Sequence, residues 1–167
     1  MSTIQTRNPT ALTRNPESTA QIAGHPLHPI LITLPIGFWV ATLLADIGFW
    51  WTRVDGWATG AMWLLGAAIV AAAAAAVTGL IDFLGDDRIR ALSKAWQHAI
   101  GNVIAVLASL FSFYWRYRYG AAGVLPTGII LSLVTVAILG FTGWLGGELV
   151  FRHRVAVQDD AGYRPAP

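Results

Sequence analysis

The chain has 167 residues, of which 55% are hydrophobic and 12% are charged, and its formal net charge is +2. An ordinary soluble domain has about 25% charged residues, so this composition indicates a membrane protein. The small net charge, distributed between apolar runs, argues against a nucleic-acid partner, and the lack of cysteine excludes disulfides, thiolate-bound iron–sulfur clusters and covalently attached c-type haem.

Residues 1–22 are predicted to be a flexible polar tail. They repeat the tetrapeptide TRNP, at Thr6–Pro9 and Thr13–Pro16, and its Asn-Pro steps favour turns over helix. We find no basic segment followed by a short apolar stretch and a small-residue cleavage site, so we expect no removable signal peptide. The polar residues 158–167 are predicted to be a second flexible tail.

The segment GHPLHP, residues 24–29, precedes the first long apolar run. Each proline biases the histidine before it away from the α conformation, which favours polyproline II with the two rings about 9 Å apart. One ion could not then bind both rings. The alternative places Pro26 at the first helical position, where a missing N–H costs little and the rings come closer together. Of the two histidines, His28 lies nearer the membrane and is the better ligand candidate.

Four apolar stretches follow, at residues 30–51, 59–84, 95–115 and 124–147. Each has the roughly 20 residues that a helix needs to span a bilayer. The short connections between them predict antiparallel neighbours. We therefore expect an all-α, integral membrane four-helix bundle with up-down-up-down topology and both termini on the same side, forming one transmembrane domain over residues 23–157.

The orientation is predicted from the distribution of lysine and arginine. The side that would hold both termini carries eight of them: Arg7, Arg14, Arg88, Arg90, Lys94, Arg152, Arg154 and Arg164. The opposite side carries three, Arg53, Arg116 and Arg118, together with more aromatic residues. The positive-inside rule places both termini in the cytoplasm, which predicts a multi-pass protein of the bacterial inner membrane. Asp46, near the outer end of the first helix, is expected to pair with one of the three outer arginines.

The helix faces are predicted at 100° per residue. In the third helix, one face is small or polar after Lys94, with His98, Gly101, Asn102, Ala105, Ser109 and Ser112; the other is bulky, with Trp96, Ile100, Val103, Leu107, Leu110, Phe111 and Tyr114. Small residues let helices approach closely in lipid, so the first face should point into the bundle. The same argument points Asp82 of the second helix inward.

All four histidines, with Asp82 and Glu148, fall on the predicted cytoplasmic side. The leading interpretation is a b-type cytochrome with a bis-histidine haem b, one axial ligand being His28 or His25 and the other His98. Arginines at that edge, Arg88, Arg90 or Arg152, would pair with the haem propionates. Electron transfer with a redox partner would be the function.

Two alternatives remain open. In one, His28, His98, Asp82 and Glu148 hold a non-haem iron, zinc or copper ion, for which mixed nitrogen and oxygen ligands are adequate. In the other, no cofactor binds, His98 hydrogen-bonds Asp82 to lock two helices, and the protein is a scaffold or interaction module. We do not predict an enzyme, because the sequence offers no nucleophile with an adjacent base and no phosphate-binding loop.

Three segments carry a family likeness: GHPLHPILITLPIG, His98 with Asn102, and GWLGGELVFRHRVAV at residues 143–157. Together they resemble the bacterial membrane-protein family called domain of unknown function 2231. The family pattern has more glycine after the last histidine, so Arg154 and Ala156 are departures that weaken any role for His153. Some members look fused to Rieske-type iron–sulfur domains, which implies a redox partner of that type. The other expected partners are the lipid bilayer and a second copy of the chain.

Overall fold

The computed structural model describes residues 15–157, and the chain there is mostly helical. Four long helices dominate: α2 (Thr33–Thr52), α3 (Asp55–Gly85), α5 (Ser93–Tyr119) and α6 (Ile129–Phe151). Short elements connect or precede them: β1 (Gln21–Ile22), β2 (His25–Pro26), α1 (Leu27–Leu31), α4 (Asp87–Arg90), η2 (Gly120–Gly123) and η3 (Val124–Gly128).

Three continuous helical stretches in the described chain are long and apolar enough to cross a membrane: Leu27–Thr52, Asp55–Gly85 and Ser93–Phe151. The first joins α1 to α2. The third contains α5, η2, η3 and α6, so short helical turns connect the segments predicted as third and fourth helices.

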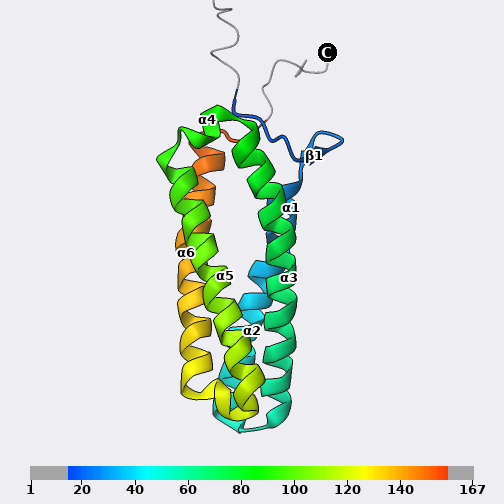
Figure 1. Ribbon diagram of the computed structural model, residues 1–167, viewed down its shortest axis with the longest axis vertical. Helices are drawn as coiled ribbons and strands as arrows, with labels where there is room; N and C mark the ends of the chain where they lie inside the picture. Colours follow the sequence, from blue (N-terminus) through cyan, green and yellow to red (C-terminus); the bar gives the residue numbers. More distant parts are fainter. Residues whose placement is uncertain (1–14, 158–167) are drawn as a thin grey trace, which may run out of the picture.

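The long helices lie lengthwise beside one another, and α4, β1 and both ends of the described chain are at one end of the molecule (Figure 1). α2 packs mainly on α3, and α5 on α6. Apolar side chains fill three clusters. One is built around Trp39, Leu65, Ala68 and Ala72, one around Phe49, Ala58 and Val124, and one around Ile89, Ala95 and Leu149.

The predicted division of the third helix into two faces is confirmed. Ala105, Ser109 and Ser112 are buried. All seven residues of the predicted lipid face are exposed, each by 47% or more. Because no hydrophobic force drives helices together in lipid, the small side chains face the neighbouring helices and the bulky ones face outward.

The N-terminal tail is shorter than predicted, since residues 15–22 are ordered. We call Asn15–Ala20 the N-terminal strap. It crosses the ends of α3, α4 and α6, and it leads into a two-stranded antiparallel hairpin in which Gln21 pairs with Pro26 and Ile22 with His25. The hairpin turns at Ala23 and Gly24, which both have positive φ, 50° and 79°. Residues 1–14 and 158–167 of the predicted tails lie outside the described chain.

The segment after α6 makes two sharp turns, at Arg154 and Ala156. These residues have φ values of 53° and 62°, in the left-handed region that glycine adopts most easily. Glycine would therefore suit the backbone conformation at both positions.

Candidate functional site

His28 reaches the bundle interior from the start of α1. Pro26, with φ −61° and ψ 127°, is extended and precedes the helix, so it is not the first helical residue. His28 Nδ1 lies 2.8 Å from the carbonyl oxygen of Ala75 on α3. A Cβ added to Gly79 would lie 2.7 Å from that same nitrogen. Because Gly79 has no side chain, it leaves the space on α3 that the His28 ring occupies.

His98 occupies a matching position on the other side of the bundle. Its Nδ1 lies 2.8 Å from the carbonyl oxygen of Thr142 on α6, and a Cβ added to Gly146 would lie 3.3 Å from its Cε1. Asn102, one turn along α5, accepts a hydrogen bond from the Thr142 hydroxyl. The carbonyl bond fixes both the ring and its tautomer, with the proton on Nδ1.

The two imidazoles face each other across the bundle. Their ring centroids are 6.2 Å apart and their planes cross at 83°. Since each Nδ1 is bonded to a carbonyl, Nε2 is the nitrogen that remains as a lone-pair donor on each ring. These two Nε2 atoms are therefore the ones with which the histidine pair could bind a metal ion.

His25 does not join this pair. It lies in β2, where its Nδ1 is 3.0 Å from the carbonyl oxygen of Ala23, within the same hairpin. The spacing of GHPLHP therefore places only its second histidine in the interior, and the first one is exposed in the hairpin.

The predicted four-ligand metal set is not assembled. Within residues 15–157, no three or more His, Asp or Glu side chains come close enough together to hold a metal ion. Asp82 instead accepts hydrogen bonds from the Ser18 hydroxyl and the Ala20 N–H of the N-terminal strap, at 2.8 and 2.7 Å. Glu148 pairs with Arg152, and His98 bonds to a backbone carbonyl rather than to Asp82. Both carboxylates are used at the ends of helices.

The three arginines predicted to hold propionates each have a carboxylate partner. Arg88 forms an ion pair with Asp86 at 2.6 Å, and Arg152 one with Glu148 at 3.1 Å. Arg90 pairs with Asp87. The hydrogen bonds from Arg88 hold the pKa of Asp86 down at about 2. A role of these arginines toward a cofactor stays a prediction.

Trp39 is a residue that the sequence patterns did not single out. Its indole Nε1 is the one side-chain polar atom in the described chain that is buried without a hydrogen-bond partner. Trp39 packs with Ala72 on α3 and Leu139 on α6, each three residues from the carbonyls that hold the histidines. The unsatisfied donor thus lies about one helical turn further into the bundle than the histidine pair.

A second buried polar group joins three helices near the opposite end. Arg116 of α5 donates to both carboxylate oxygens of Asp46 on α2, at 2.7 Å each, and Ser132 of α6 also donates to Asp46 at 2.7 Å. Asp46 and Arg116 are 0% and 2% exposed. The expected pairing of Asp46 with an outer arginine is confirmed, and the group is complete without a ligand.

The sequence profile of the family described as "Predicted membrane protein (DUF2231)" matches residues 24–159. The match begins at the glycine of the hairpin turn and includes every long helix. No curated protein and no solved structure is similar to the chain at a significant level.

Proposed function

Since this chain belongs to the DUF2231 family of predicted membrane proteins, we propose that it is a small b-type cytochrome in which His28 and His98 bind one haem. The observation that carries the proposal is the pair of facing imidazoles, 6.2 Å apart, each anchored through Nδ1 to a backbone carbonyl. Anchoring of this kind is the usual arrangement behind a metal-binding histidine.

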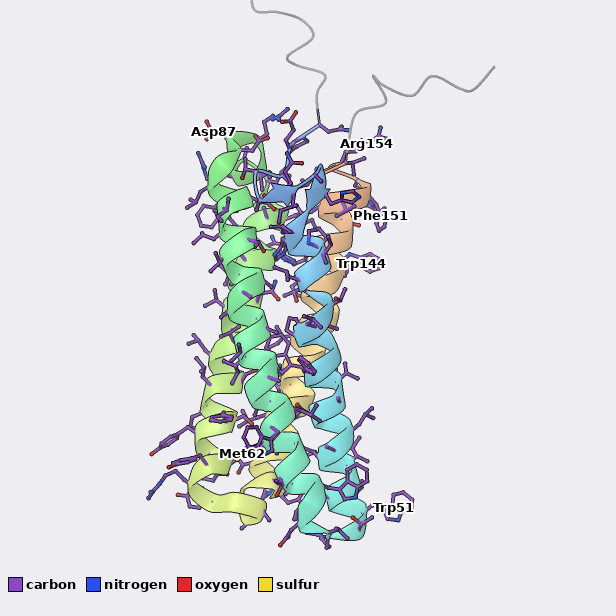
Figure 2. The ribbon with its side chains drawn as sticks, turned by 90° about the vertical axis from the view of Figure 1, so that its right-hand side faces the viewer. Trp51, Met62, Asp87, Trp144, Phe151 and Arg154 are labelled. Carbon is purple, nitrogen blue, oxygen red and sulfur yellow. The ribbon has the colours of Figure 1, made fainter. Side chains whose placement is uncertain are left out.

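The membrane position of the pair follows from the aromatic residues of α5. Trp96 and Tyr114 are both exposed, by 50% and 59%, and are 18 residues apart (114 minus 96). At 1.5 Å per residue that is about 27 Å, close to the thickness of the hydrocarbon layer. Figure 2 supports this placement, with Trp144 and Phe151 pointing outward near one end and Trp51 near the other. His98 then lies just inside the membrane, beneath the interface marked by Trp96.

The proposal includes separate crossings for α5 and α6. Each is long enough to span alone, at 27 and 23 residues. Four crossings in up-down-up-down order would return both ends of the chain to one side, and the lysine and arginine distribution favours the cytoplasmic side of the inner membrane. A redox protein at that face, of the Rieske type that the family resemblance implies, would be the exchange partner.

The donor set fits a haem better than a non-haem ion. His28 and His98 would be the two protein ligands of a haem iron, whereas a non-haem ion would need further protein ligands, and Asp82 and Glu148 are bonded elsewhere. The buried N–H of Trp39 agrees with a bound group or water in this interior, because an unsatisfied buried donor costs about 1–3 kcal/mol.

A bound haem would supply one-electron chemistry at its iron. The residues of this chain hold and orient it. The carbonyl oxygens of Ala75 and Thr142 accept the Nδ1 protons, which raises the basicity of each Nε2. More basic ligands stabilise the oxidised iron, so we expect a low midpoint potential.

Absorption spectra of the protein purified from haem-supplied cells test the proposal. We expect a Soret band in the wild type and in His25→Ala, which is the matched control from the same motif. His28→Ala and His98→Ala should each lose the bis-histidine spectrum, and added imidazole should restore it. A wild type without a Soret band, or unchanged spectra in both variants, would overturn the proposal.

The cofactor-free alternative makes a different prediction. If the histidines serve only helix packing, then each alanine variant should lower the thermal stability through loss of a bond between helices, while neither haem nor metal is found in any sample. Elemental analysis of the same preparations separates this outcome from a non-haem metal site.

A further inference from the structure

The N-terminal strap is fastened to the end of α3 at the Asp82 carboxylate and at the Ile81 carbonyl. Asp82 Oδ1 accepts the Ser18 hydroxyl at 2.8 Å and the Ala20 N–H at 2.7 Å, and the Thr19 hydroxyl donates to the Ile81 carbonyl at 2.9 Å. Ser18 and Ala20 are buried, at 5% and 7% exposure. The middle of the strap is therefore packed against the end of the bundle.

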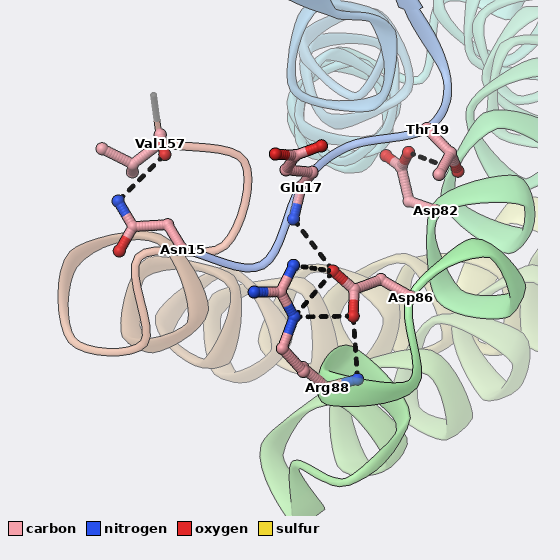
Figure 3. A network of polar contacts seen from close by, with 7 residues as sticks. All are labelled: Asn15, Glu17, Thr19, Asp82, Asp86, Arg88 and Val157. Atoms are coloured by element: carbon pink, nitrogen blue, oxygen red, sulfur yellow. Dashed lines mark hydrogen bonds and ion pairs between the residues drawn. The ribbon is translucent and has the colours of Figure 1, made fainter. Parts of the chain in front are cut away.

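Two further contacts hold the strap to other elements. The Glu17 N–H donates to Asp86 Oδ2 at 3.0 Å, next to the Arg88–Asp86 ion pair, and the Asn15 side chain donates to the Val157 carbonyl at 3.1 Å (Figure 3). Pro16 accepts the Ala156 N–H at 2.8 Å. The strap thus joins the ends of α3 and α6 across the face that carries both ends of the described chain.

We call the bonds of Asp82 to the strap the latch. The latch lies next to the histidine pair, toward the end of the bundle that carries the strap. Asp82 is three residues after Gly79, against which the His28 ring packs, so the two are one turn apart on the same face of α3. The strap is also connected to His28. The Ala20 carbonyl accepts a hydrogen bond from the N–H of Leu27, the residue before His28, at 2.8 Å.

The other boundaries of the histidine pair are made by helices. Trp39, Leu65, Ala68 and Ala72 pack together on the inner side, and Ile89, Ala95 and Leu149 pack together at the strap end. Opening either cluster would separate helices. The strap is the boundary held by hydrogen bonds from a non-helical segment, so it can leave while the bundle stays intact.

We infer that the N-terminal strap is a lid, latched by Asp82, that controls access of a cofactor and of small ligands to the His28–His98 site. With the latch closed, the strap excludes water and holds the start of α1. With the latch open, the site is reached from the end of the bundle. The statement that the strap controls entry of a cofactor rests on the proposed function. The statement that it controls access of small ligands does not.

A buried probe thiol tests access without any cofactor. The native chain has no cysteine, so His98→Cys in the full-length protein gives one reactive group at the site. We expect a water-soluble maleimide to label it at least tenfold faster when Asp82→Ala is added. Ser109→Cys, buried on the same helix at 1% exposure, is the matched control and should not respond to Asp82→Ala. Equal labelling rates at position 98 with and without the latch would overturn the inference.

A reversible disulfide tests cofactor entry. A Cβ placed on Gly85 lies 2.9 Å from Thr19 Cβ, so Thr19→Cys with Gly85→Cys can be bridged after a shift of about 1 Å. We expect haemin to load into the oxidised double variant at least tenfold more slowly than after reduction, with Thr19→Cys alone unaffected by the oxidant. Equal loading in both states would contradict the lid. Failure of every sample, wild type included, to bind haemin would instead count against the haem proposal, and the maleimide rates would still decide the lid.

Discussion

At the scale of single residues, the ion pair between Asp46 and Arg116 is the feature whose burial costs the most free energy if either partner is lost. Both side chains are almost fully removed from solvent, and Ser132 donates to the same carboxylate. A buried pair of this kind contributes little relative to an apolar replacement, but either charge is costly when left alone. The pair therefore holds α2, α5 and α6 in one arrangement.

We expect Asp46→Ala to lower the free energy of unfolding by about 3–5 kcal/mol, because Arg116 would remain buried and unpaired. The double variant Asp46→Leu with Arg116→Met should lose much less. Asp55→Ala, at an exposed carboxylate, is the control. Thermal unfolding in detergent measures all three, and a single variant no less stable than the double would contradict the argument.

Trp39 offers a second residue-scale test. Trp39→Phe keeps most of the apolar packing and removes the unsatisfied N–H, so the cofactor-free protein should be no less stable than the wild type. If a bound group accepts from that N–H, haem affinity in the same variant should fall. Unfolding of the cofactor-free protein together with a haem titration separates the two effects; a large loss of stability without cofactor would show that the indole N–H has a partner inside the protein itself.

The left-handed backbone conformation of Ala156 can be tested by substitution with glycine. Its φ of 62° costs an L-residue about 1–2 kcal/mol, while glycine brings an entropic cost of about 0.5–1 kcal/mol. Ala156→Gly should therefore stabilise the protein by up to about 1 kcal/mol, measured by thermal unfolding. Ala76→Gly, in the middle of α3, should destabilise it by a similar amount.

At the scale of the elements, Gly79 and Gly146 leave the space that the imidazoles of His28 and His98 occupy. A methyl group at Gly79 would lie 2.7 Å from His28 Nδ1, so Gly79→Ala should displace that ring from the Ala75 carbonyl. We expect loss or distortion of the bis-histidine spectrum. Gly140→Ala is the control in α6, where an added Cβ meets nothing within 4 Å and alanine favours the helix. An unaltered spectrum in Gly79→Ala would contradict the assigned ring position.

The strap should also respond to acid through Asp86. Its pKa is about 2 in the folded protein against 3.8 for a free aspartate, because Arg88 and the Glu17 N–H bond to the charged form. A lowered folded pKa contributes stability that is fully present above about pH 4 and is lost as the pH falls through about 2. The protection of the Glu17 amide from hydrogen exchange should fall over that window in the wild type, whereas Asp86→Ala, which lacks the acceptor, should show low protection at every pH. Protection of Glu17 that is equal in both proteins at neutral pH would contradict the contact.

At the scale of the whole molecule, the helical architecture could be predicted because lipid imposes a simple rule. Every residue of the predicted bulky face of the third helix is exposed, and Ala105, Ser109 and Ser112 of its predicted inner face are buried. The period of the pattern determines these faces. The pairing of Asp46 with an outer arginine followed from the topology instead, because Asp46 and the three arginines all lie near the same end of the predicted bundle.

The contacts of the site could be predicted only in part. The convergence of His28 and His98 followed from topology, yet their partners are backbone carbonyls of Ala75 and Thr142, which no side-chain pattern reveals. Asp82 is predicted to point into the bundle, and in the structure its carboxylate accepts hydrogen bonds from the strap. The strap itself resembles a disordered tail in composition, because its order comes from bonds to α3 and to residues 156–157 rather than from apolar periodicity.

The proposed orientation makes a prediction for the intact cell. A membrane-impermeant maleimide should label Arg118→Cys from outside, because that position follows the outer aromatic residues of α5. Asp87→Cys, beside α4 at the other end, should be labelled only after permeabilisation. The cysteine-free native chain makes both variants unambiguous. The opposite result would invert the orientation, and labelling of both positions from outside would contradict the up-down-up-down crossing.

The bond between Asn15 and Val157 joins residues 142 positions apart along the chain. Ribosomes add about 5–20 residues per second, so roughly 7–30 s separate the synthesis of the two partners. After Gly85 has been translated, α1 and α3 are present while Val157, the far anchor of the strap, is not. The nascent protein therefore passes through a stage in which the strap lacks its contacts with residues 156–157, and translation of these two residues completes the closure of the histidine-bearing end.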